Sequence, residues 1–483
     1  MGHRVTRRTF LETCTTAGGA ILAGGLAARP LAAAEEAGWP KLPPVKIHVV
    51  YIGLGGAWPK PDFDAKAEVL KFQKLLDGVR QRLADVEFVG GELIPNQEAA
   101  AAALAPKLAG ADALLIVHLA FGAGPPLLKL IDAGLPTAIF SQPFSGHDWM
   151  YVPRWQKAGK KVILLPSSDY GDLERAAALL RVPARMRQTR ILHVGGPHGT
   201  PAAQSAAKVK AALGAELISV SVPRVLAAHE AVDLKAAEAE AETYWIQAAK
   251  KIVEPSRDEI VKSARMFLAM KNLMIEHNAR AITIHCLGGI PIDKIGYPCL
   301  GFSKLLDLGL VGACEADMDS TLTMLLFGYA FGKPGFITDP LFDLSKNAMI
   351  HAHCVAPTKM DGPGGARAPF TIRTHRDDNR GASLAVDLRV GQEITCAKLC
   401  NLDTMLLSAQ KIIEIPDFDD RGCRTQIVAQ VADAQNMLAN WGSGVLDRAD
   451  MMTMLHRVVF YGNHVENVRH LAQLMGVKTI MEG

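Results

Sequence analysis

Short apolar runs alternate with longer amphipathic segments through the first 300 residues, and this alternation constrains the fold more than any other feature. Residues 45–53 (VKIHVVYIG), 113–119 (ALLIVHL) and 281–285 (AITIH) have the length and composition of buried strands. Because strands that alternate with helices form parallel sheets, we expect an α/β protein. Its first part should consist of two Rossmann-like parallel α/β domains, residues 35–185 and 186–300.

The pattern changes toward the C-terminus. Segments there alternate apolar and polar residues with turns between them, as half-buried antiparallel strands do. These segments are residues 370–373, 383–390, 393–399, 412–415 and 423–431. We expect them to form an antiparallel β-barrel module within a C-terminal catalytic-type domain, residues 301–483. Long helices are expected before it, over residues 227–252 and 257–277.

The first 34 residues have the composition of an export signal. Arg7 and Arg8 lie in TRRTFL, an apolar stretch rich in Gly and Ala follows, and residues 32–34 are small residues suited to signal peptidase. This order resembles the twin-arginine signal, which directs folded proteins to the bacterial periplasm. The alternative is a basic N-terminal helix that stays on the protein. We expect residues 1–34 to be a twin-arginine signal peptide and the mature protein to be periplasmic or exported.

The charge balance bears on the class of partner. The chain holds 52 Lys and Arg against 49 Asp and Glu, and the excess lies within the first 34 residues, so the remaining chain is close to neutral. It has no basic stripe of the kind that nucleic-acid binding needs. No uninterrupted apolar run long enough for a transmembrane helix follows the N-terminal segment. We therefore expect no nucleic-acid partner and no membrane span in the mature chain.

Eight cysteines occur in the sequence. Cys286, Cys314 and Cys354 lie in apolar runs, as small buried hydrophobic residues do. Cys396 and Cys400 lack a second close pair, so we expect no structural zinc site there. A disulfide stays an open alternative in an oxidising compartment.

Two carboxylates flank one apolar helix in the second half of the chain. Glu315 ends the apolar run LVGAC, and Asp339 follows the run GFIT, with Pro340 closing it. Residues 321–331 (TLTMLLFGYAF) have a helical pattern, which Gly-Lys-Pro at 332–334 ends. Acids at the ends of apolar segments joined by one buried helix can converge. Converging carboxylates bind a hard divalent cation or transfer protons.

Two further acids, Asp317 and Asp319, follow Glu315 at the start of the same helix. Carboxylates are favoured at a helix N-terminus because they interact well with the helix dipole. The simpler interpretation of both residues is therefore helix capping. For Glu315 and Asp339 we favour a functional site.

Residues 314–340 (CEADMDSTLTMLLFGYAFGKPGFITDP), followed by Ala-His-Cys at 352–354, resemble the C-terminal half of the L-fucose/L-arabinose isomerase superfamily. Its members share a Cys-Glu-(Gly/Ala)-Asp motif, an apolar helix, Gly-(Lys/Arg)-Pro, a strand that ends in an acid, and a His-Cys pair. The resemblance runs from about residue 282 to the C-terminus. It implies a metal-dependent aldose–ketose isomerase that works through an enediolate and acts on a small-molecule carbohydrate.

The resemblance also implies which residues carry this chemistry. Such a reaction needs a metal to polarise the sugar oxygens, and a base and an acid to move the proton. The implied metal ligands are Glu315, Asp339 and His456, the last in LHRVVFYG at 455–462, and the two acids double as catalytic residues. The expected metal is Mn²⁺, with Mg²⁺ as the alternative. His464 is an alternative C-terminal ligand.

Three histidines are candidates for substrate binding. His353, in the His-Cys pair, is a substrate contact or a fourth ligand, since a histidine at this point ligates metal in the arabinose-isomerase branch of the similar family. His118 and His285 end apolar strands, where open α/β sheets present ligand groups. The alternative for each is a satisfied histidine at the edge of the core. His351 is interpreted as structural, and His375 is a weaker substrate candidate.

Two Gly-rich turns follow apolar strands, at residues 53–56 and 195–199. Neither matches the dinucleotide-binding or P-loop pattern, so we expect no nicotinamide or ATP site. Both could still line a sugar pocket.

Two other functions stay open. A related metal-dependent sugar lyase or epimerase would use the same residues on a larger or oxidised sugar. A non-catalytic periplasmic carbohydrate-binding protein would use the α/β domains as a cleft. The resemblance further implies a homo-oligomer, a trimer or hexamer, in which the N-terminal domain of one chain covers the C-terminal site of the next, with His118 reaching that site. Trp441 and the methionines at 451, 452 and 454 are candidate interface anchors, or ordinary core residues.

Overall fold

The computed structural model describes residues 33–482, apart from residue 36 and the segments 55–57, 417–420 and 442–454. Nearly all of the expected export signal, and the methionines at 451, 452 and 454, therefore lie outside the described residues. Within the described part of the chain, no helix combines the length and the apolar character needed to cross a bilayer.

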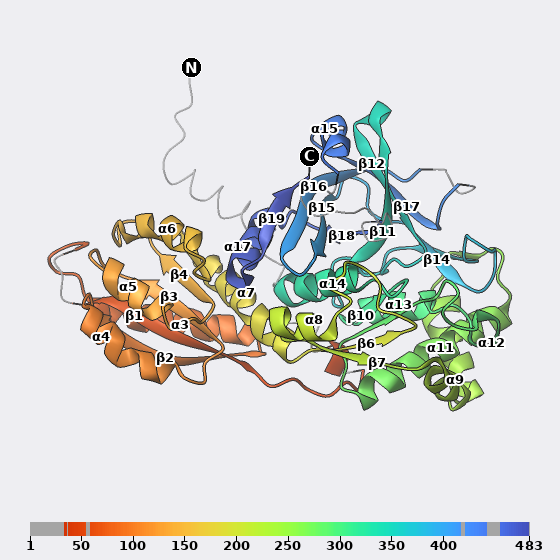
Figure 1. Ribbon diagram of the computed structural model, residues 1–483, viewed down its shortest axis with the longest axis horizontal. Helices are drawn as coiled ribbons and strands as arrows, with labels where there is room; N and C mark the ends of the chain where they lie inside the picture. Colours follow the sequence, from red (N-terminus) through yellow and green to blue (C-terminus); the bar gives the residue numbers. More distant parts are fainter. Residues whose placement is uncertain (1–32, 36, 55–57, 417–420, 442–454, 483) are drawn as a thin grey trace, which may run out of the picture.

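The N-terminal part of the chain forms a five-stranded parallel sheet with strand order β2-β1-β3-β4-β5 (Figure 1). Successive side chains of a strand point to opposite faces, so Val49 and Tyr51 of β1 join one apolar core, and Val50 and Ile52 join a second. Helices cover both faces, which is why the inner strands are buried throughout. The strands are β1 (Val45–Leu54), β2 (Val86–Pro95), β3 (Ala113–His118), β4 (Thr137–Ser141) and β5 (Val162–Pro166). The helices are α3 (Ala65–Arg82), α4 (Glu98–Leu104), η2 (Ala105–Leu108), α5 (Gly124–Ile131), η3 (Asp148–Tyr151), α6 (Val152–Lys157) and α7 (Gly171–Arg187).

A second parallel sheet has four strands in the order β10-β9-β6-β7. Its strands are β6 (Arg190–Val194), β7 (Glu216–Ser219), β9 (Ala281–Ile284) and β10 (Val311–Ala313). Its helices are α8 (Ala206–Leu213), α9 (Val222–Glu230), α10 (Leu234–Glu240), the π-helix η4 (Ala241–Ile246), α11 (Arg257–Glu276), α12 (Ile292–Ile295) and α13 (Cys299–Asp307). The mixed α/β class with two parallel sheets is confirmed. The Rossmann-like detail and the domain limits stay predictions, and β10 joins this sheet from beyond residue 300.

The expected long helix over residues 227–252 is wrong. The chain there divides into α9, α10 and η4, and residues 251–252 form the short strand β8 (Lys251–Ile252). Asp233 starts the second of these helices, because its side chain accepts a hydrogen bond from the backbone N–H of Ala236. An N-cap of this kind satisfies a backbone donor that a continuous helix would not expose. The second expected helix, over residues 257–277, agrees with α11.

The C-terminal region contains a closed antiparallel barrel of six strands, in the order β15-β18-β11-β12-β17-β16, which the β15–β16 pairing closes. The strands are β11 (Phe336–Asp343), β12 (Ala348–His353), β15 (Glu393–Cys400), β16 (Thr404–Glu414), β17 (Thr425–Gln430) and β18 (Arg457–Tyr461). A further strand, β19 (Lys478–Met481), pairs in parallel with β16. The other elements of this region are η5 (Leu344–Lys346), α15 (Ala434–Ala439) and α17 (Val465–Met475). The expectation of an antiparallel barrel is confirmed.

Two details of the expected barrel are wrong. The barrel begins earlier than expected, because β11 continues through Pro340 to Asp343. β11 pairs with β18 only through Thr338, so Pro340 has a paired strand on one side only, where a residue without an N–H is tolerated. The expected first strands are not barrel strands. β13 (Phe370–Arg373) and β14 (Ser383–Val386) form a separate small sheet with β8.

Helix α14 (Met318–Phe331) lies between the second sheet and the barrel and contacts β10, β15 and α7. Nearly all of its side chains are buried, which explains why its sequence is apolar on every side. It begins at the N-cap Asp317, and it ends at Gly332, whose φ of 63° is the left-handed conformation that favours glycine. This helix runs from the edge of the second sheet along the barrel.

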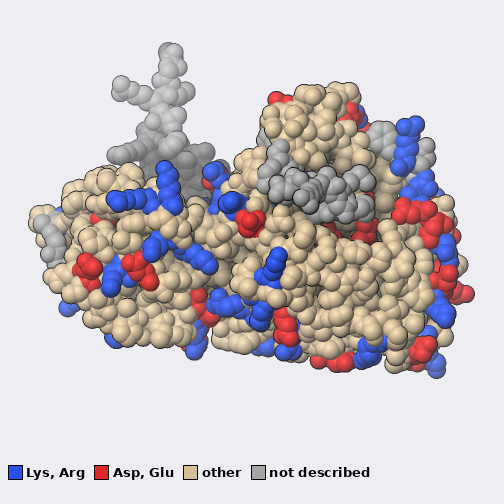
Figure 2. Space-filling view, viewed as in Figure 1, with Lys and Arg blue, Asp and Glu red and all other residues tan. Residues whose placement is uncertain are grey.

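Charged side chains of both signs are interspersed over the face of the molecule that Figure 2 presents. The described residues on this face show no continuous stripe of one sign. The surface therefore matches the near-neutral composition of the chain after its first 34 residues.

Candidate functional site

Two carboxylates and two imidazoles meet where the barrel faces the second sheet. Nε2 of His456 lies 3.5 Å from a carboxylate oxygen of Glu315 and 3.4 Å from one of Asp339. Nε2 of His353 lies 3.6 Å from the other carboxylate oxygen of Glu315. The structure thus brings together the three expected ligands and His353. We call Glu315, Asp339, His353 and His456 the four-residue site.

Three of these side chains, those of Asp339, His353 and His456, lie on or next to three strands of the barrel. Asp339 pairs with Ala352 across β11 and β12, and His353, the last residue of β12, directly follows Ala352. His456 directly precedes β18, and β18 pairs with β11 up to Thr338, next to Asp339. Strand register therefore brings Asp339 and His456 together, although more than a hundred residues separate them in sequence.

Glu315 comes from the other side, at the carboxyl end of β10 in the second sheet. Its φ is 58° and that of the next residue, Ala316, is 55°, which are left-handed conformations that only a few per cent of non-glycine residues adopt. Backbone strain of this kind costs about 1–3 kcal/mol per residue and concentrates at functional sites. Here the two left-handed residues turn the chain sharply between β10 and the start of α14, so that the Glu315 carboxylate faces the barrel residues.

The four groups perturb one another's protonation. Burial by itself would raise the pKa of Glu315, but the imidazoles of His353 and His456 outweigh it and lower that pKa to about 2. Burial would lower the pKa of His353, but the carboxylates of Glu315 and Asp339 raise it to about 9. Burial raises the pKa of Asp339, against the opposing influence of the two imidazoles. Strong mutual perturbation of this kind is typical of functional sites.

Several polar atoms of the site have no hydrogen-bond partner, although they are buried. They are Nε2 of His456, Oδ1 of Asp339 and Nδ1 of His353. Buried polar atoms normally have partners, so these atoms point to a ligand. One ligand atom each from Asp339, His353 and His456 lies within 4.8 Å of the others. Two carboxylates and two imidazoles suit a divalent cation such as Mn²⁺, and bound metal would displace the imidazole protons because its ligands bind deprotonated.

Asp317 has a larger part than helix capping. It does cap α14, since its side chain accepts from the backbone N–H of Ser320. Its other carboxylate oxygen lies 2.8 Å from Nδ1 of His456 and 3.0 Å from Nζ of Lys398, and Lys398 is fully buried. Despite burial, the charges of Lys398 and His456 lower the pKa of Asp317. A carboxylate behind a histidine fixes the ring so that its other nitrogen can bind metal.

Asp319 stays a structural residue. Its carboxylate accepts hydrogen bonds from the backbone N–H and the hydroxyl of Thr200, and it is fully buried. Burial, together with the nearby charge of Asp317, raises the pKa of Asp319 to about 7 against the opposing charge of Lys398. These contacts tie the start of α14 to the loop after β6.

His285 lies beside the four-residue site, in contact with a residue that the sequence did not single out. Its ring packs edge-on against that of His198, with 4.4 Å between ring centres. Nδ1 of His198 is 3.0 Å from the backbone oxygen of Glu315. Burial and the neighbouring His198 lower the pKa of His285, against the influence of Glu315. The sequence signal for His198 is its place in the Gly-rich turn at 195–199, one of the two turns that could line a sugar pocket.

The structure does not bring His118 to this site. Its ring nitrogens lie 2.9 Å from Oγ of Ser141 and 3.0 Å from a carboxylate oxygen of Asp148, and the side chain is 1% exposed. Figure 1 shows its sheet at one end of the molecule, apart from barrel strands β11, β12 and β18. Within one chain, His118 is thus a satisfied buried histidine.

The other candidate histidines have different partners. His351 lies 2.9 Å from the hydroxyl of Thr338 and 2.8 Å from Gln410, and burial lowers its pKa to about 4. His464 stacks on the ring of Phe331 and contacts the backbone oxygen of Tyr461. His375 stacks on Tyr297.

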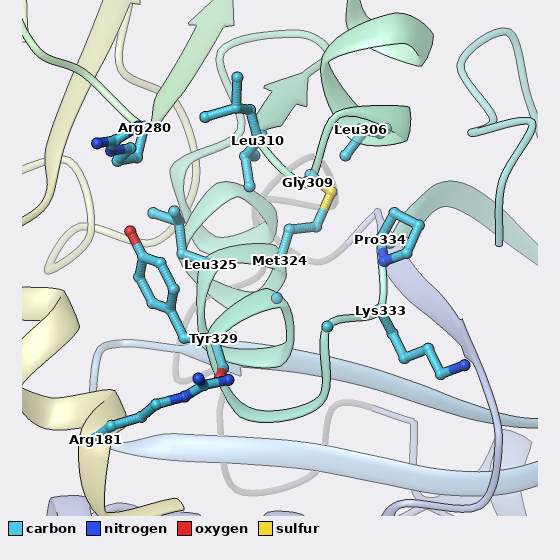
Figure 3. Close-up of a pocket in the computed structure, with 14 residues that line it drawn as sticks. Arg181, Arg280, Leu306, Gly309, Leu310, Met324, Leu325, Tyr329, Lys333 and Pro334 are labelled. Carbon is cyan, nitrogen blue, oxygen red and sulfur yellow. The ribbon is translucent and has the colours of Figure 1, made fainter. Parts of the chain in front are cut away.

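A separate pocket lies at the other end of α14 (Figure 3). Met324, Leu325 and Tyr329 of that helix line it, together with Arg181 and Arg280. No lining residue belongs to the four-residue site. Its cavity volume is only about 20 Å³, enough for little more than one or two water molecules. This narrow pocket therefore does not compete with the carboxylate–imidazole cluster as a reaction site.

Comparison with known proteins finds a partial and distant similarity. No protein-family model matches the chain. The chain is similar to a protein described as sulfoquinovose isomerase from Alkalicoccus urumqiensis, with 24% identity over 192 residues. The matched part covers 38% of this chain and 42% of that relative, less than half of either.

Proposed function

We propose that this protein is an exported, metal-dependent sugar isomerase of the fucose/arabinose type. The observation that carries the proposal is the convergence of Glu315, Asp339, His353 and His456, three of which have unpartnered buried atoms. The distant similarity to a sugar isomerase agrees with it. Mn²⁺ is the metal we expect, held by Glu315, Asp339 and His456 with His353 as the fourth ligand.

The proposed reaction moves a proton between two neighbouring carbons of an open-chain sugar. A divalent cation supplies polarisation of the sugar oxygens and so makes the carbon proton more acidic. Glu315 follows strand β10 of the second sheet and Asp339 lies on barrel strand β11, and their carboxylates approach the same point. One can therefore take the carbon proton while the other gives a proton to oxygen. His285 and His198 lie beside Glu315 and can hold sugar hydroxyls in place.

A sugar panel with and without EDTA tests this function. We would assay the purified protein with Mn²⁺ on neutral aldoses such as L-fucose and L-arabinose, and on sulfoquinovose, the sugar in the relative's description. We expect aldose–ketose conversion that EDTA abolishes and Mn²⁺ restores. Conversion that EDTA leaves unchanged would contradict the proposed metal dependence, and binding without turnover of any sugar would favour a carbohydrate-binding protein.

We also propose that the protein assembles as a homo-oligomer through the N-terminal sheet. Large apolar side chains are exposed there, including Trp58, Phe121, Phe144 and Trp149, and Phe144 is 82% exposed. They contact one another: Trp58 lies near Phe121 and donates a hydrogen bond to the backbone oxygen of Phe144. Exposed apolar patches of this kind mark interaction surfaces.

This apolar surface lies over His118. A Cβ atom on Gly146 would come within 2.8 Å of Phe121 and 3.2 Å of the His118 ring, so both residues border the same loop. If the surface packs against the barrel of a second copy, His118 comes close to that copy's four-residue site. The sequence resemblance implies an arrangement of this type, a trimer or hexamer.

A further inference from the structure

A thiol lies at the wall of the four-residue site. One ligand atom each from Cys314, Glu315 and His353 lies within 4.8 Å of the others. Cys314 is 1% exposed, and its sulfur is 3.3 Å from that of Cys286 at the end of the neighbouring strand β9. The proposed isomerase chemistry has no use for this thiol, since it needs only oxygen and nitrogen ligands.

Backbone conformation explains why Cys314 and Glu315 face the same space. Consecutive side chains of an extended strand point to opposite faces. The left-handed φ of 58° at Glu315 breaks this alternation directly after Cys314, and Ala316 continues it at 55°. Both the thiol and the carboxylate can therefore approach His353, a nearly fully buried residue whose Nδ1 has no hydrogen-bond partner.

We propose that Cys314, Glu315 and His353 form a second cation position that selects thiophilic metals such as Zn²⁺ and Cd²⁺. Thiolate, imidazole and carboxylate are the three ligand types of protein zinc sites, whereas Mn²⁺ and Mg²⁺ favour oxygen ligands. When the metal binds, a metal–sulfur bond forms, the S–H bond breaks and the thiol proton passes to solvent, with no change of oxidation state.

The two positions compete. His353 belongs both to this thiol position and to the group that it forms with Asp339 and His456. A thiophilic cation that binds Glu315 and His353 removes ligands from the Mn²⁺ position. This competition rests on the proposed function, because the Mn²⁺ position is part of it. Zn²⁺ and Cd²⁺ should therefore displace Mn²⁺ and inhibit the enzyme, and Cys314 should determine how strongly they do so.

Cadmium spectroscopy on the full chain tests this position without relying on activity. Cd²⁺ bound to a thiolate gives an ultraviolet charge-transfer band, and paramagnetic resonance of Mn²⁺ separates free from bound ion. We expect one equivalent of Cd²⁺ to produce the band in the wild-type protein and to release bound Mn²⁺. In Cys314→Ser the band should disappear and the affinity for Cd²⁺ should fall by at least the 10- to 100-fold typical of losing even an outer-shell partner.

Cys396→Ser is the matched control, because Cys396 is a buried cysteine on barrel strand β15 that belongs to neither metal group. It should leave the cadmium band unchanged. A band of full intensity in folded Cys314→Ser would assign the metal to other thiols, such as the neighbouring Cys354 and Cys423, and would overturn the proposal. Absence of the band in wild-type protein would overturn it as well.

The two proposals fail in different ways. A cadmium band that depends on Cys314, in a protein that binds no Mn²⁺ and converts no sugar, would leave the thiol position standing and remove the isomerase. Mn²⁺-dependent turnover that Zn²⁺ inhibits equally in wild type and Cys314→Ser would support the isomerase and overturn the thiol position.

Discussion

Nδ1 of His456 lies 2.8 Å from a carboxylate oxygen of Asp317, the residue that also caps helix α14. This contact orients the imidazole so that its Nε2 faces Glu315 and Asp339, at 3.5 and 3.4 Å. The start of the helix and the proposed metal ligand are therefore coupled through one carboxylate. Lys398, at 3.0 Å from the same oxygen, balances its charge in the buried interior.

Asp317→Asn should weaken Mn²⁺ binding by about 10- to 100-fold, the usual effect of losing the partner behind a histidine ligand. Asn also caps helices well, so the change removes the charge and keeps the cap. It leaves the buried Lys398 without its carboxylate partner, at a cost of about 3–5 kcal/mol in the free energy of unfolding. Titration calorimetry with Mn²⁺ and urea denaturation would measure both effects.

The double variant Asp317→Asn with Lys398→Met separates these effects. We expect it to regain stability, because no unpaired charge is buried, and to keep the weakened Mn²⁺ affinity. If the double variant binds Mn²⁺ as tightly as wild type, Asp317 does not position His456. Asp343→Asn, at a half-buried acid at the far end of β11 whose side chain caps η5, should leave the Mn²⁺ affinity unchanged.

The metal-free protein should lose stability between pH 6.5 and 9. His353 has its pKa raised to about 9 from 6.5 by Glu315 and Asp339, against the opposing influence of burial. Its protonated form therefore contributes stability that is fully present below pH 6.5 and is lost as the pH rises through 9. The loss is on the order of 3 kcal/mol. Denaturation in EDTA at both pH values would measure it.

His353→Gln is the comparison for this pH effect. The variant should lack the loss of stability over the same interval, because it has no imidazole to deprotonate. A wild-type protein that is equally stable at both pH values in EDTA would contradict the prediction. With Mn²⁺ present the trend should reverse, since metal binding competes with protons and strengthens as the pH rises.

Glu315→Gln and Asp339→Asn should each abolish stoichiometric Mn²⁺ binding. A neutral amide keeps the shape of the side chain and loses the anionic oxygens that hard cations require. Metal analysis of the purified variants would check this, and turnover of any converted sugar should fall by at least about 100-fold. Glu393→Gln, an exposed acid at the start of β15, is the control. Equal metal content in Glu315→Gln and wild type would remove Glu315 from the ligand set.

The double change Arg7→Lys with Arg8→Lys should block export. Both residues lie outside the described part of the structure, so this prediction rests on the sequence pattern. Fractionation and the length of the mature chain would show the outcome. A variant that is still processed and still reaches the periplasm would exclude the twin-arginine route.

Phe144→Asn should shift the oligomer toward monomer. Phe144 is 82% exposed and has a φ of 71°, a conformation that Asn adopts more readily than an aromatic residue. The change therefore removes apolar contact area without destabilising the monomer. Light scattering at micromolar concentration would measure it. Leu70→Gln, at another strongly exposed apolar residue on α3, should leave the mass unchanged. A wild-type monomer with full metal-dependent activity would contradict the shared site.

The sequence by itself determined the elements whose signal is local. Apolar runs of strand length identified most strands of the two parallel sheets, and the apolar segment ending in Gly-Lys-Pro identified α14. The same local patterns indicated Glu315 and Asp339 as candidate site residues, because each follows a short apolar run. The strand and helix predictions succeeded because periodicity and helix-end residues depend only on near neighbours in the chain.

Only the tertiary structure decided which distant residues meet. The pairing of β11 with both β12 and β18 brings His353 and His456 to Asp339, and no local pattern shows that register. The same is true of Asp317: its position predicted a cap, and only the fold places His456 and Lys398 against it. His118 shows the reverse case, since its strand was predicted and, within one chain, the structure holds it away from the four-residue site. Strand pairing is a long-range property, so the chemistry of this site depends on contacts that span more than a hundred residues.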